Sequence, residues 1–261
     1  MKIIDFHTHV YPDAIAPKAA ESVRTFYGLG NPSMNGMVST LLQEGKKVGT
    51  TQYVILPVAM RPERTRHIND FILDTLQNHE EFFGFGTVHA AMEDLMGEVD
   101  YICQKGLRGI KMHPDSQVFS IDDERLFPMY EQLQGKLPIL FHMGDHRFDY
   151  SHPARLKHLL ELFPNLQVIA AHFGGYELYE EAYGLLKDTG CFFDVSSSLM
   201  FMQPGEAERY INLYGAERFV YGSDYPMWDP VEEMSRFMKL KLTNDQREQI
   251  FYKTAEHLLK I

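Results

Sequence analysis

The chain has 261 residues, of which 44% are apolar and 23% are charged, as in ordinary globular proteins. This composition excludes the disordered and fibrous classes, and no apolar run approaches the roughly 18 residues of a membrane-spanning helix. Lys and Arg total 25 against 36 Asp and Glu, a net charge of −11 that argues against nucleic-acid and membrane partners. The first residues lack the apolar stretch of a signal peptide, so we expect a cytoplasmic protein.

Eight short apolar runs, most of them followed by a helix-like stretch, are the strongest periodic feature of the chain. They occupy residues 2–6, 52–57, 82–88, 107–112, 138–141, 166–171, 191–195 and 218–221. Runs of this length with few charges are typical of strands buried on both faces. The segments between them predict helices at 65–78, 94–105, 125–134, 153–163, 231–240 and 244–259.

Strands that alternate with helices predict right-handed βαβ units and a parallel sheet. Eight such units in a chain of this length predict a (β/α)₈ TIM barrel, an α/β fold that forms a single domain over residues 1–261. An open doubly wound sheet is the alternative, but no glycine-rich phosphate loop follows the first strand. Residues 11–49 interrupt the pattern, and we expect them to form a loop-and-helix excursion over the barrel mouth, a candidate lid.

Histidine and aspartate recur where the predicted strands end. The first strand ends with His7 and His9, whose side chains point to the same side because they are two residues apart. His142 follows the fifth strand, and Asp224 follows the eighth, which lies beside the first in a closed barrel. Three imidazoles and one carboxylate suit Zn²⁺, and less strongly Fe²⁺ or Mn²⁺. These residues predict a divalent metal site at the mouth, where TIM barrels carry their active sites.

Other polar residues at the same level have open roles. His172 is either a fifth ligand or a group that hydrogen-bonds the substrate or a metal-bound water. Lys111 is expected to bind a substrate carboxylate or to be paired within the protein, and a carbamylated Lys111 that bridges two metals is the alternative. His113 is placed to reach the pocket, and Arg61 lies in a loop where it could clamp a carboxylate.

The motifs DFHTHVYP, GIKMHP, LFHMG, FPNLQVIAAHFGG and VYGSDYP together resemble the amidohydrolase superfamily. The resemblance is strongest to the amidohydrolase-related branch that includes aminocarboxymuconate-semialdehyde decarboxylase and the resorcylate decarboxylases. It extends from Asp5 to the final predicted helix. It implies that His7, His9, His142 and Asp224 hold one divalent metal and that His172 is a catalytic residue beside it. Self-association as a homodimer is also implied, because barrels of this branch often pair.

Two reactions on a small-molecule substrate are compatible with these residues. The first is hydrolysis of a carboxylate-bearing ester, lactone or amide by a metal-activated water, with Asp224 taking the proton and His172 stabilising the oxyanion. Lys111, Arg61 and His113 are then the candidate substrate-binding residues. The alternative is nonoxidative decarboxylation of a small unsaturated or aromatic acid, in which Asp224 or His172 manages the proton that replaces carbon dioxide. A binding protein that had lost catalysis would be expected to lack some of the ligands, and none is missing.

Overall fold

The computed structural model describes residues 2–29 and 34–261, so residues 30–33 of the expected excursion lie outside the described part. Each of the eight predicted runs overlaps a strand, although β1 extends beyond its run to Thr8, and the third run contains two strands because its ladder is interrupted at Phe85. The strands are β1 (Ile4–Thr8), β2 (Gln52–Ile55), β3 (Phe82–Gly84), β4 (Gly86–Thr87), β5 (Ile110–Met112), β6 (Ile139–Phe141), β7 (Val168–Ala170), β8 (Phe192–Asp194) and β9 (Phe219–Val220).

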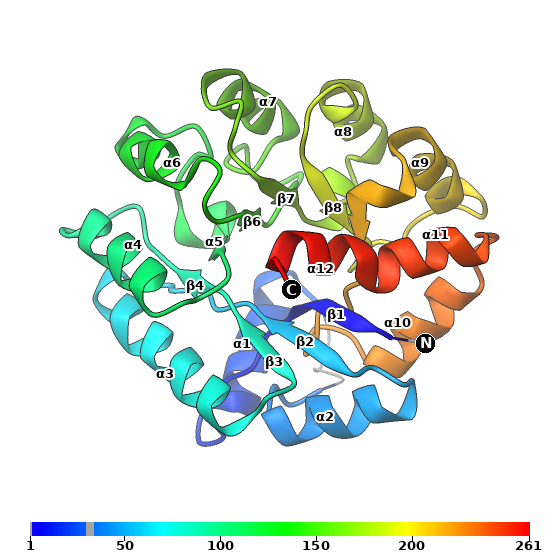
Figure 1. Ribbon diagram of the computed structural model, residues 1–261, viewed down its shortest axis with the longest axis horizontal. Coiled ribbons are helices and arrows are strands. Elements are labelled where there is room, and N and C mark those ends of the chain that lie inside the picture. The colour runs from blue at the N-terminus through cyan, green and yellow to red at the C-terminus, as the bar shows by residue number, and fades with distance from the viewer. Residues whose placement is uncertain (1, 30–33) are drawn as a thin grey trace.

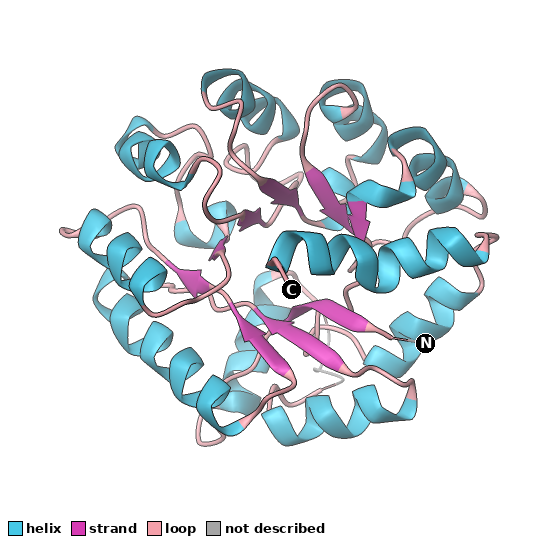
Figure 2. Ribbon diagram, viewed as in Figure 1, coloured by secondary structure: helices cyan, strands magenta, loops and turns pink. Residues whose placement is uncertain are grey.

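Helices surround the strands (Figure 2). The α-helices are α1 (Ala16–Phe26), α2 (Val38–Lys47), α3 (Thr65–Asn78), α4 (Leu95–Gln104), α5 (Pro114–Gln117), α6 (Phe127–Leu133), α7 (Pro153–Leu162), α8 (Tyr179–Leu186), α9 (Glu206–Tyr214), α10 (Pro230–Met238), α11 (Asn244–Glu248) and α12 (Thr254–Leu259). The helix predicted at 65–78 is confirmed with the same bounds. The helix predicted at 244–259 begins with a capping box between Thr243 and Gln246, and a π-helical turn, η5 (Gln249–Lys253), divides it.

All strand pairs are parallel, and the sheet closes into a barrel. β1, β2 and β3 form one ladder, and β4 to β9 form another in chain order. Backbone bonds join the two ladders on both sides: Phe85 N–H donates to Ile55 O, and Phe6 N–H donates to Tyr221 O at 2.8 Å. A single bridge between Thr8 and Tyr225 extends the second junction toward the carboxyl ends of the strands. The fold is therefore a (β/α)₈ TIM barrel, as the sequence predicts.

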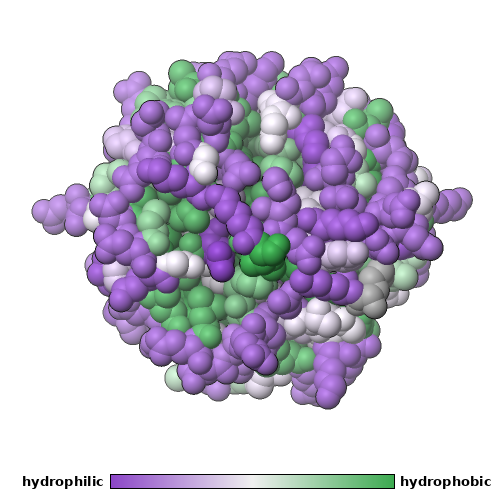
Figure 3. All heavy atoms as spheres, in the orientation of Figure 1, coloured by the Kyte–Doolittle hydropathy of each residue, from purple (hydrophilic) through white to green (hydrophobic). Residues whose placement is uncertain are grey.

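Two apolar cores stabilise the barrel. One lies between the strands and the ring of helices, and the other fills the barrel interior with side chains such as Phe6, Leu56 and Phe85. Leu258 and Leu259 of α12 belong to the interior core, so α12 closes the end at which the strands begin (Figure 1). The outer surface at this end is largely hydrophilic, with smaller apolar areas between the helices (Figure 3). The open mouth, and any active site, must lie at the opposite end.

The excursion after β1 has two parts with different positions. α2 packs against α10 and takes a place in the outer ring (Figure 1). α1 lies at the mouth, where Arg24 donates to Met227 O at 2.7 Å and Arg147 donates to Phe26 O at 2.5 Å. These two arginine contacts connect the end of α1 to the loops after β9 and β6. Among the described residues, no helix has both the length and the apolar character required to cross a membrane.

Candidate active site

A pocket of about 250 Å³ lies at the carboxyl ends of the strands. Strand ends that are far apart in the sequence supply its charged and imidazole side chains: His7, His9, Lys111, His113, His142, His172 and Asp224. α1 supplies apolar wall through Val23 and Phe26, and Tyr27, which follows α1, also lines the pocket. The mouth thus combines a polar floor with an apolar cover.

The backbone at the rim is unusual where it carries these side chains. His172, Ser197 and Asp224 have φ values of 58°, 52° and 56°, a conformation that costs a residue other than glycine about 1–3 kcal/mol. Hydrogen bonds hold it, because Asp224 N–H donates to His7 O at 2.8 Å. Gly222 is required for the same close approach, since a Cβ there would lie 2.7 Å from the Cβ of His7. A contact with β1 thus offsets the strain at Asp224, and Asp194 of β8 accepts from the backbone N–H of His172 at 3.0 Å.

His7, His9 and Asp224 bring three electron-pair donors together. The Nε2 atoms of His7 and His9 are 3.2 Å apart. The Oδ1 atom of Asp224 lies 3.5 Å from the first nitrogen and 3.3 Å from the second. Ser197 Oγ donates to the other carboxylate oxygen, Oδ2, and Trp228 Nε1–H donates to Ser197 Oγ at 2.8 Å. Oδ1 is therefore directed toward the two imidazoles.

The partners of the two Nδ1 atoms decide where the imidazole protons are. His7 Nδ1 lies 2.7 Å from Asp194 Oδ2, and His9 Nδ1 lies 2.5 Å from Leu56 O. Both partners accept hydrogen bonds and cannot donate them, so each Nδ1 carries a proton, and each Nε2 has a lone pair in the neutral form of the ring. Burial lowers the pKa of His7 to about 4, so this imidazole is neutral at pH 7. With His9 neutral as well, two lone pairs and a carboxylate converge with no proton between them.

A divalent cation fits this arrangement. Zinc binds imidazole nitrogen at about 2.0–2.1 Å and carboxylate oxygen at about 2.0–2.2 Å, so tetrahedral donors lie about 3.3–3.5 Å apart. The three observed separations are 3.2, 3.3 and 3.5 Å. Neutral imidazoles and an ionised carboxylate are also the protonation states that metal binding requires.

His142, the fourth predicted ligand, does not face this cluster in the described structure. Its Nδ1 lies 3.0 Å from His172 Nε2, and its Nε2 lies 3.3 Å from the Tyr27 hydroxyl. His172 Nδ1 donates to Ser196 O at 3.1 Å, so in a neutral His172 the Nε2 atom accepts, and His142 Nδ1 donates to it. Both ring nitrogens of His142 are thereby engaged, and its role as a ligand stays a prediction.

Lys111 points into the pocket from β5 and is 1% exposed. Among the described residues, no carboxylate lies within ion-pair distance of its ammonium. Burial lowers the pKa of Lys111 to about 8, although the negative charges of Asp224 and Asp194 act in the opposite direction. At neutral pH the pocket therefore contains a buried ammonium without a contacting anion, which is unfavourable until an anion binds.

The two other predicted substrate-binding residues differ in position. His113 lines the pocket, stacks on His142 with ring centroids 3.9 Å apart, and has its Nε2 2.7 Å from the Tyr27 hydroxyl. Arg61 is exposed and is not among the residues that line the pocket, although its neighbour Met60 is. Substrate binding by Arg61 therefore remains a prediction. It would require the loop after β2 to turn toward the pocket.

The model of the amidohydrolase family matches residues 4–261. The chain belongs to the amidohydrolase family. This result agrees with the family indicated by the sequence motifs, and it makes the chain an enzyme of the amidohydrolase superfamily. A comparison of the sequence with curated proteins found no match.

Solved structures share the fold of this amidohydrolase at low sequence identity. A TIM-barrel protein from Bordetella bronchiseptica superposes with a TM-score of 0.84 and is 21% identical in sequence. The alignment covers 100% of this chain and 99% of the Bordetella chain. A dihydroxybenzoic acid decarboxylase from Polaromonas, crystallised with manganese and an inhibitor, has a TM-score of 0.78 and 15% identity, with 99% and 97% covered. 5-Carboxyvanillate decarboxylase from Sphingomonas paucimobilis has a TM-score of 0.77 and 15% identity, with 100% and 99% covered.

Several functional side chains of this amidohydrolase were not predicted from its sequence. They are Tyr27, which bridges two histidines, and Asp194, Ser196 and Ser197, which contact the predicted site residues. One signal was available for Asp194, because it is a carboxylate at the end of a strand with two buried faces. Tyr27 has no such signal, since its position depends on how α1 crosses the mouth.

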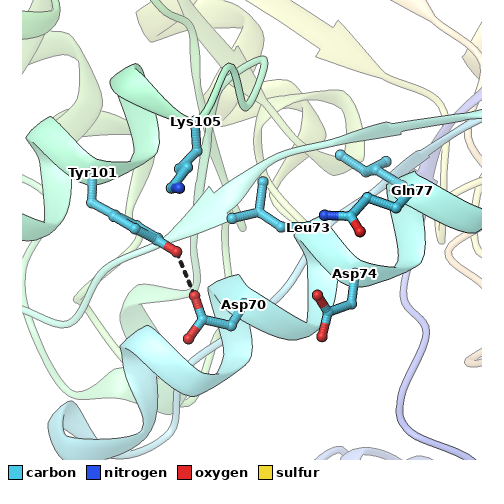
Figure 4. Close-up of a pocket in the computed structure, with 7 residues that line it drawn as sticks. Asp70, Leu73, Asp74, Gln77, Tyr101 and Lys105 are labelled. Atoms are coloured by element: carbon cyan, nitrogen blue, oxygen red, sulfur yellow. Dashed lines mark hydrogen bonds between the residues drawn. The ribbon is translucent and has the colours of Figure 1, made fainter.

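A second hollow, of about 450 Å³, lies on the outside of the barrel between α3 and α4. Asp70, Asp74, Tyr101 and Lys105 line it, and Tyr101 donates to Asp70 at 2.6 Å (Figure 4). It has no histidine and lies beside the helices, away from the carboxyl ends of the strands. Its larger volume therefore does not make it the better candidate, because active sites of this fold form at the strand ends.

Proposed function

We propose that this amidohydrolase is a metal-dependent hydrolase of a small ester, lactone or amide that carries a carboxylate. The observation that carries the proposal is that one pocket contains both a cluster whose donor atoms could hold a cation and the unpaired ammonium of Lys111. The cluster suits a reacting carbonyl, and the ammonium suits an anion elsewhere on the same molecule. The volume of about 250 Å³ restricts the substrate to a small molecule.

His7, His9 and Asp224 would hold one divalent cation, with His142 as a further ligand after rotation of its ring. A divalent cation in such a site lowers the pKa of a bound water toward about 7 and polarises a carbonyl oxygen. Zinc is the proposed ion on account of the nitrogen-rich ligands, and manganese or iron are the alternatives. Manganese has support from the related decarboxylase that was crystallised with it. A second metal bridged by a carbamylated Lys111 is the less favoured arrangement.

Three residues of the chain would act on the substrate. Lys111 binds the carboxylate and fixes the orientation of the molecule, which favours attack on one carbonyl group. Asp224 accepts the proton of the attacking water, and its Ser197 hydrogen bond keeps the accepting oxygen turned toward the site. His172 lines the same pocket, and once His142 has turned away, the Nε2–H of a doubly protonated His172 would donate to the oxyanion. His113 and Arg61 are proposed as additional contacts to the substrate.

Nonoxidative decarboxylation is the second candidate, and the names of five structural neighbours favour it. Lys111 favours hydrolysis for an electrostatic reason. Loss of carbon dioxide removes the negative charge from a carboxylate, so an ammonium beside that carboxylate stabilises the ground state more than the transition state. If Lys111 binds the carboxylate, a reaction that leaves this carboxylate on the product is favoured over one that releases it as carbon dioxide. A decarboxylase would have to bind the departing carboxylate elsewhere in the pocket.

A panel of small carboxylate-bearing lactones, esters, amides and aromatic acids separates the two reactions. Protein loaded with zinc or with manganese is assayed for acid release and, in parallel, for carbon dioxide release. We expect metal-dependent acid release that disappears on chelation. Carbon dioxide release without acid release would establish the second candidate, and the absence of both would contradict the proposal.

A further inference from the structure

Asp194, at the end of β8, is the buried group that joins two of the site histidines. Its side chain is fully buried, with 0% exposure. Four hydrogen bonds converge on its carboxylate. His7 Nδ1–H donates to Oδ2 at 2.7 Å, and Oδ1 accepts from Ser196 Oγ at 2.6 Å, from Ser196 N at 3.0 Å and from His172 N at 3.0 Å. Because the carboxylate has no exposed surface, its charge is stabilised by these donors of the protein.

One oxygen of this carboxylate determines the tautomer of His7. A neutral imidazole in water distributes its proton between both nitrogens, and only the form with a free Nε2 can present a lone pair toward His9 and Asp224, where the cation would bind. The carboxylate accepts and does not donate, so it fixes the proton on Nδ1. Because the bond is charge-assisted, it also makes Nε2 a stronger electron-pair donor.

The other oxygen supports His172. The backbone of His172 has a φ of 58°, and its N–H donates to Asp194 Oδ1. The residue that bonds the same oxygen, Ser196, accepts the His172 Nδ1 proton through its carbonyl at 3.1 Å. Asp194 therefore holds the ring of His7 through one oxygen and the backbone of His172 through the other.

We infer that Asp194 is a positioning residue for the cation site, which sets the metal-binding tautomer of His7 and couples that site to the placement of His172. The inference rests on the proposed function, because it assumes the cation. An asparagine at position 194 keeps the size of the side chain but can donate its amide proton to His7 Nδ1. It would then hold the imidazole proton on Nε2, where it blocks the lone pair.

The test compares Asp194→Asn with Asp5→Asn. Asp5 is equally buried and also lies beside His7, but it accepts from the backbone N–H groups of His7 and Ser223 and does not contact the ring. Zinc affinity is measured by competition with a chelating dye. We expect Asp194→Asn to bind zinc roughly 10- to 100-fold more weakly, as when other groups behind metal-binding histidines are removed. We expect Asp5→Asn to keep its zinc affinity within about threefold, because Asp5 contacts backbone N–H groups and not the imidazole of His7.

The tautomer gives a second measurement that requires neither metal nor activity. Long-range ¹H–¹⁵N spectra of histidine-labelled protein, assigned with His7→Gln, report which nitrogen carries the proton. We expect the Nδ1–H form of His7 in the wild type and the Nε2–H form in Asp194→Asn. Equal zinc affinity of Asp194→Asn and wild type overturns this inference alone, whereas a wild type that binds neither zinc nor manganese overturns the proposed function as well. If the variant does not fold, the Nε2–H form in the wild type would still refute the inference.

Discussion

Replacement of Lys111 by methionine is expected to make the protein more stable and less active. Burial lowers the pKa of Lys111 from 10.5 to about 8. Each pKa unit corresponds to about 1.4 kcal/mol, so the charged ammonium destabilises the folded state by about 3 kcal/mol at pH 7. Below pH 8 the lysine is charged in both states and the whole penalty applies. Between pH 8 and 10.5 the folded state loses its proton, and the penalty declines.

Urea unfolding at pH 7 in the presence of a chelator, followed by the fluorescence of the single tryptophan, Trp228, measures this difference. Lys111→Met is expected to raise the free energy of unfolding by about 3 kcal/mol at pH 7 and by less than half of that at pH 9.5. Lys105→Met is the matched control, because Lys105 is exposed and its charge is solvated in both states. It should change the stability by less than about 0.5 kcal/mol.

The activity of the same variant should change in the opposite direction. A lost charge-assisted contact of about 1.5–3 kcal/mol corresponds to a fall of roughly 10- to 100-fold in kcat/KM for a carboxylate substrate. An uncharged analogue of that substrate should be turned over equally by both proteins. A variant that is no more stable than the wild type at pH 7, or one that retains its kcat/KM, would refute the assignment of Lys111 as an unpaired anion-binding group.

Three further expectations concern the cluster and its pH dependence. Asp224→Asn should lose at least about 10²-fold in turnover with metal still present by mass spectrometry, and unchanged turnover would count against a catalytic role. Zinc at about 100 times its dissociation constant should raise the free energy of unfolding by about 2.7 kcal/mol in the wild type and much less in His9→Ala, so a melting temperature indifferent to zinc would contradict the site. The KM for a carboxylate substrate should rise as the pH passes through about 8, where Lys111 loses its charge, and a flat profile from about pH 6.5 to 9.5 would exclude this residue as the anchor.

The barrel could be predicted from the sequence because its strands are buried on both faces and its helices are not. Continuous apolar runs indicate the strands, and amphipathic spacing indicates the helices, as at Thr65–Asn78. The exact strand ends could not be predicted, since they depend on which backbone group finds a partner. Tyr221 falls within a predicted strand, but its N–H donates at 2.8 Å to Ile250 O in the π-helical turn η5, so β9 ends at Val220.

The position of the site at the carboxyl ends of the strands could also be predicted from the sequence. The orientation of its imidazole rings could not. Parallel strands bring their carboxyl ends to one mouth, so His7 and Asp224 meet although 217 positions separate them. The direction of an imidazole depends on rotamers and on partners from other strands. His142 illustrates this point, because its nitrogens bond His172 and Tyr27, and Tyr27 is supplied by the excursion that interrupts the barrel pattern.

The positions of the imidazole protons decide which of three candidate metal-binding groups could bind a cation, because the distances between their donor atoms do not. Three groups of described residues have their donor atoms close enough for a metal: His7, His172 and Asp194; His7, His9 and Asp224; and His113, Asp115 and His142. In the first group a proton on His7 Nδ1 already joins the imidazole to the carboxylate. In the third, the Tyr27 hydroxyl lies 2.7 Å from His113 Nε2 and 3.3 Å from His142 Nε2, where it can accept from one and donate to the other. Only in the second group do the Nε2 lone pairs of two neutral imidazoles face a carboxylate without a proton between them, so it is the group that a cation would stabilise most.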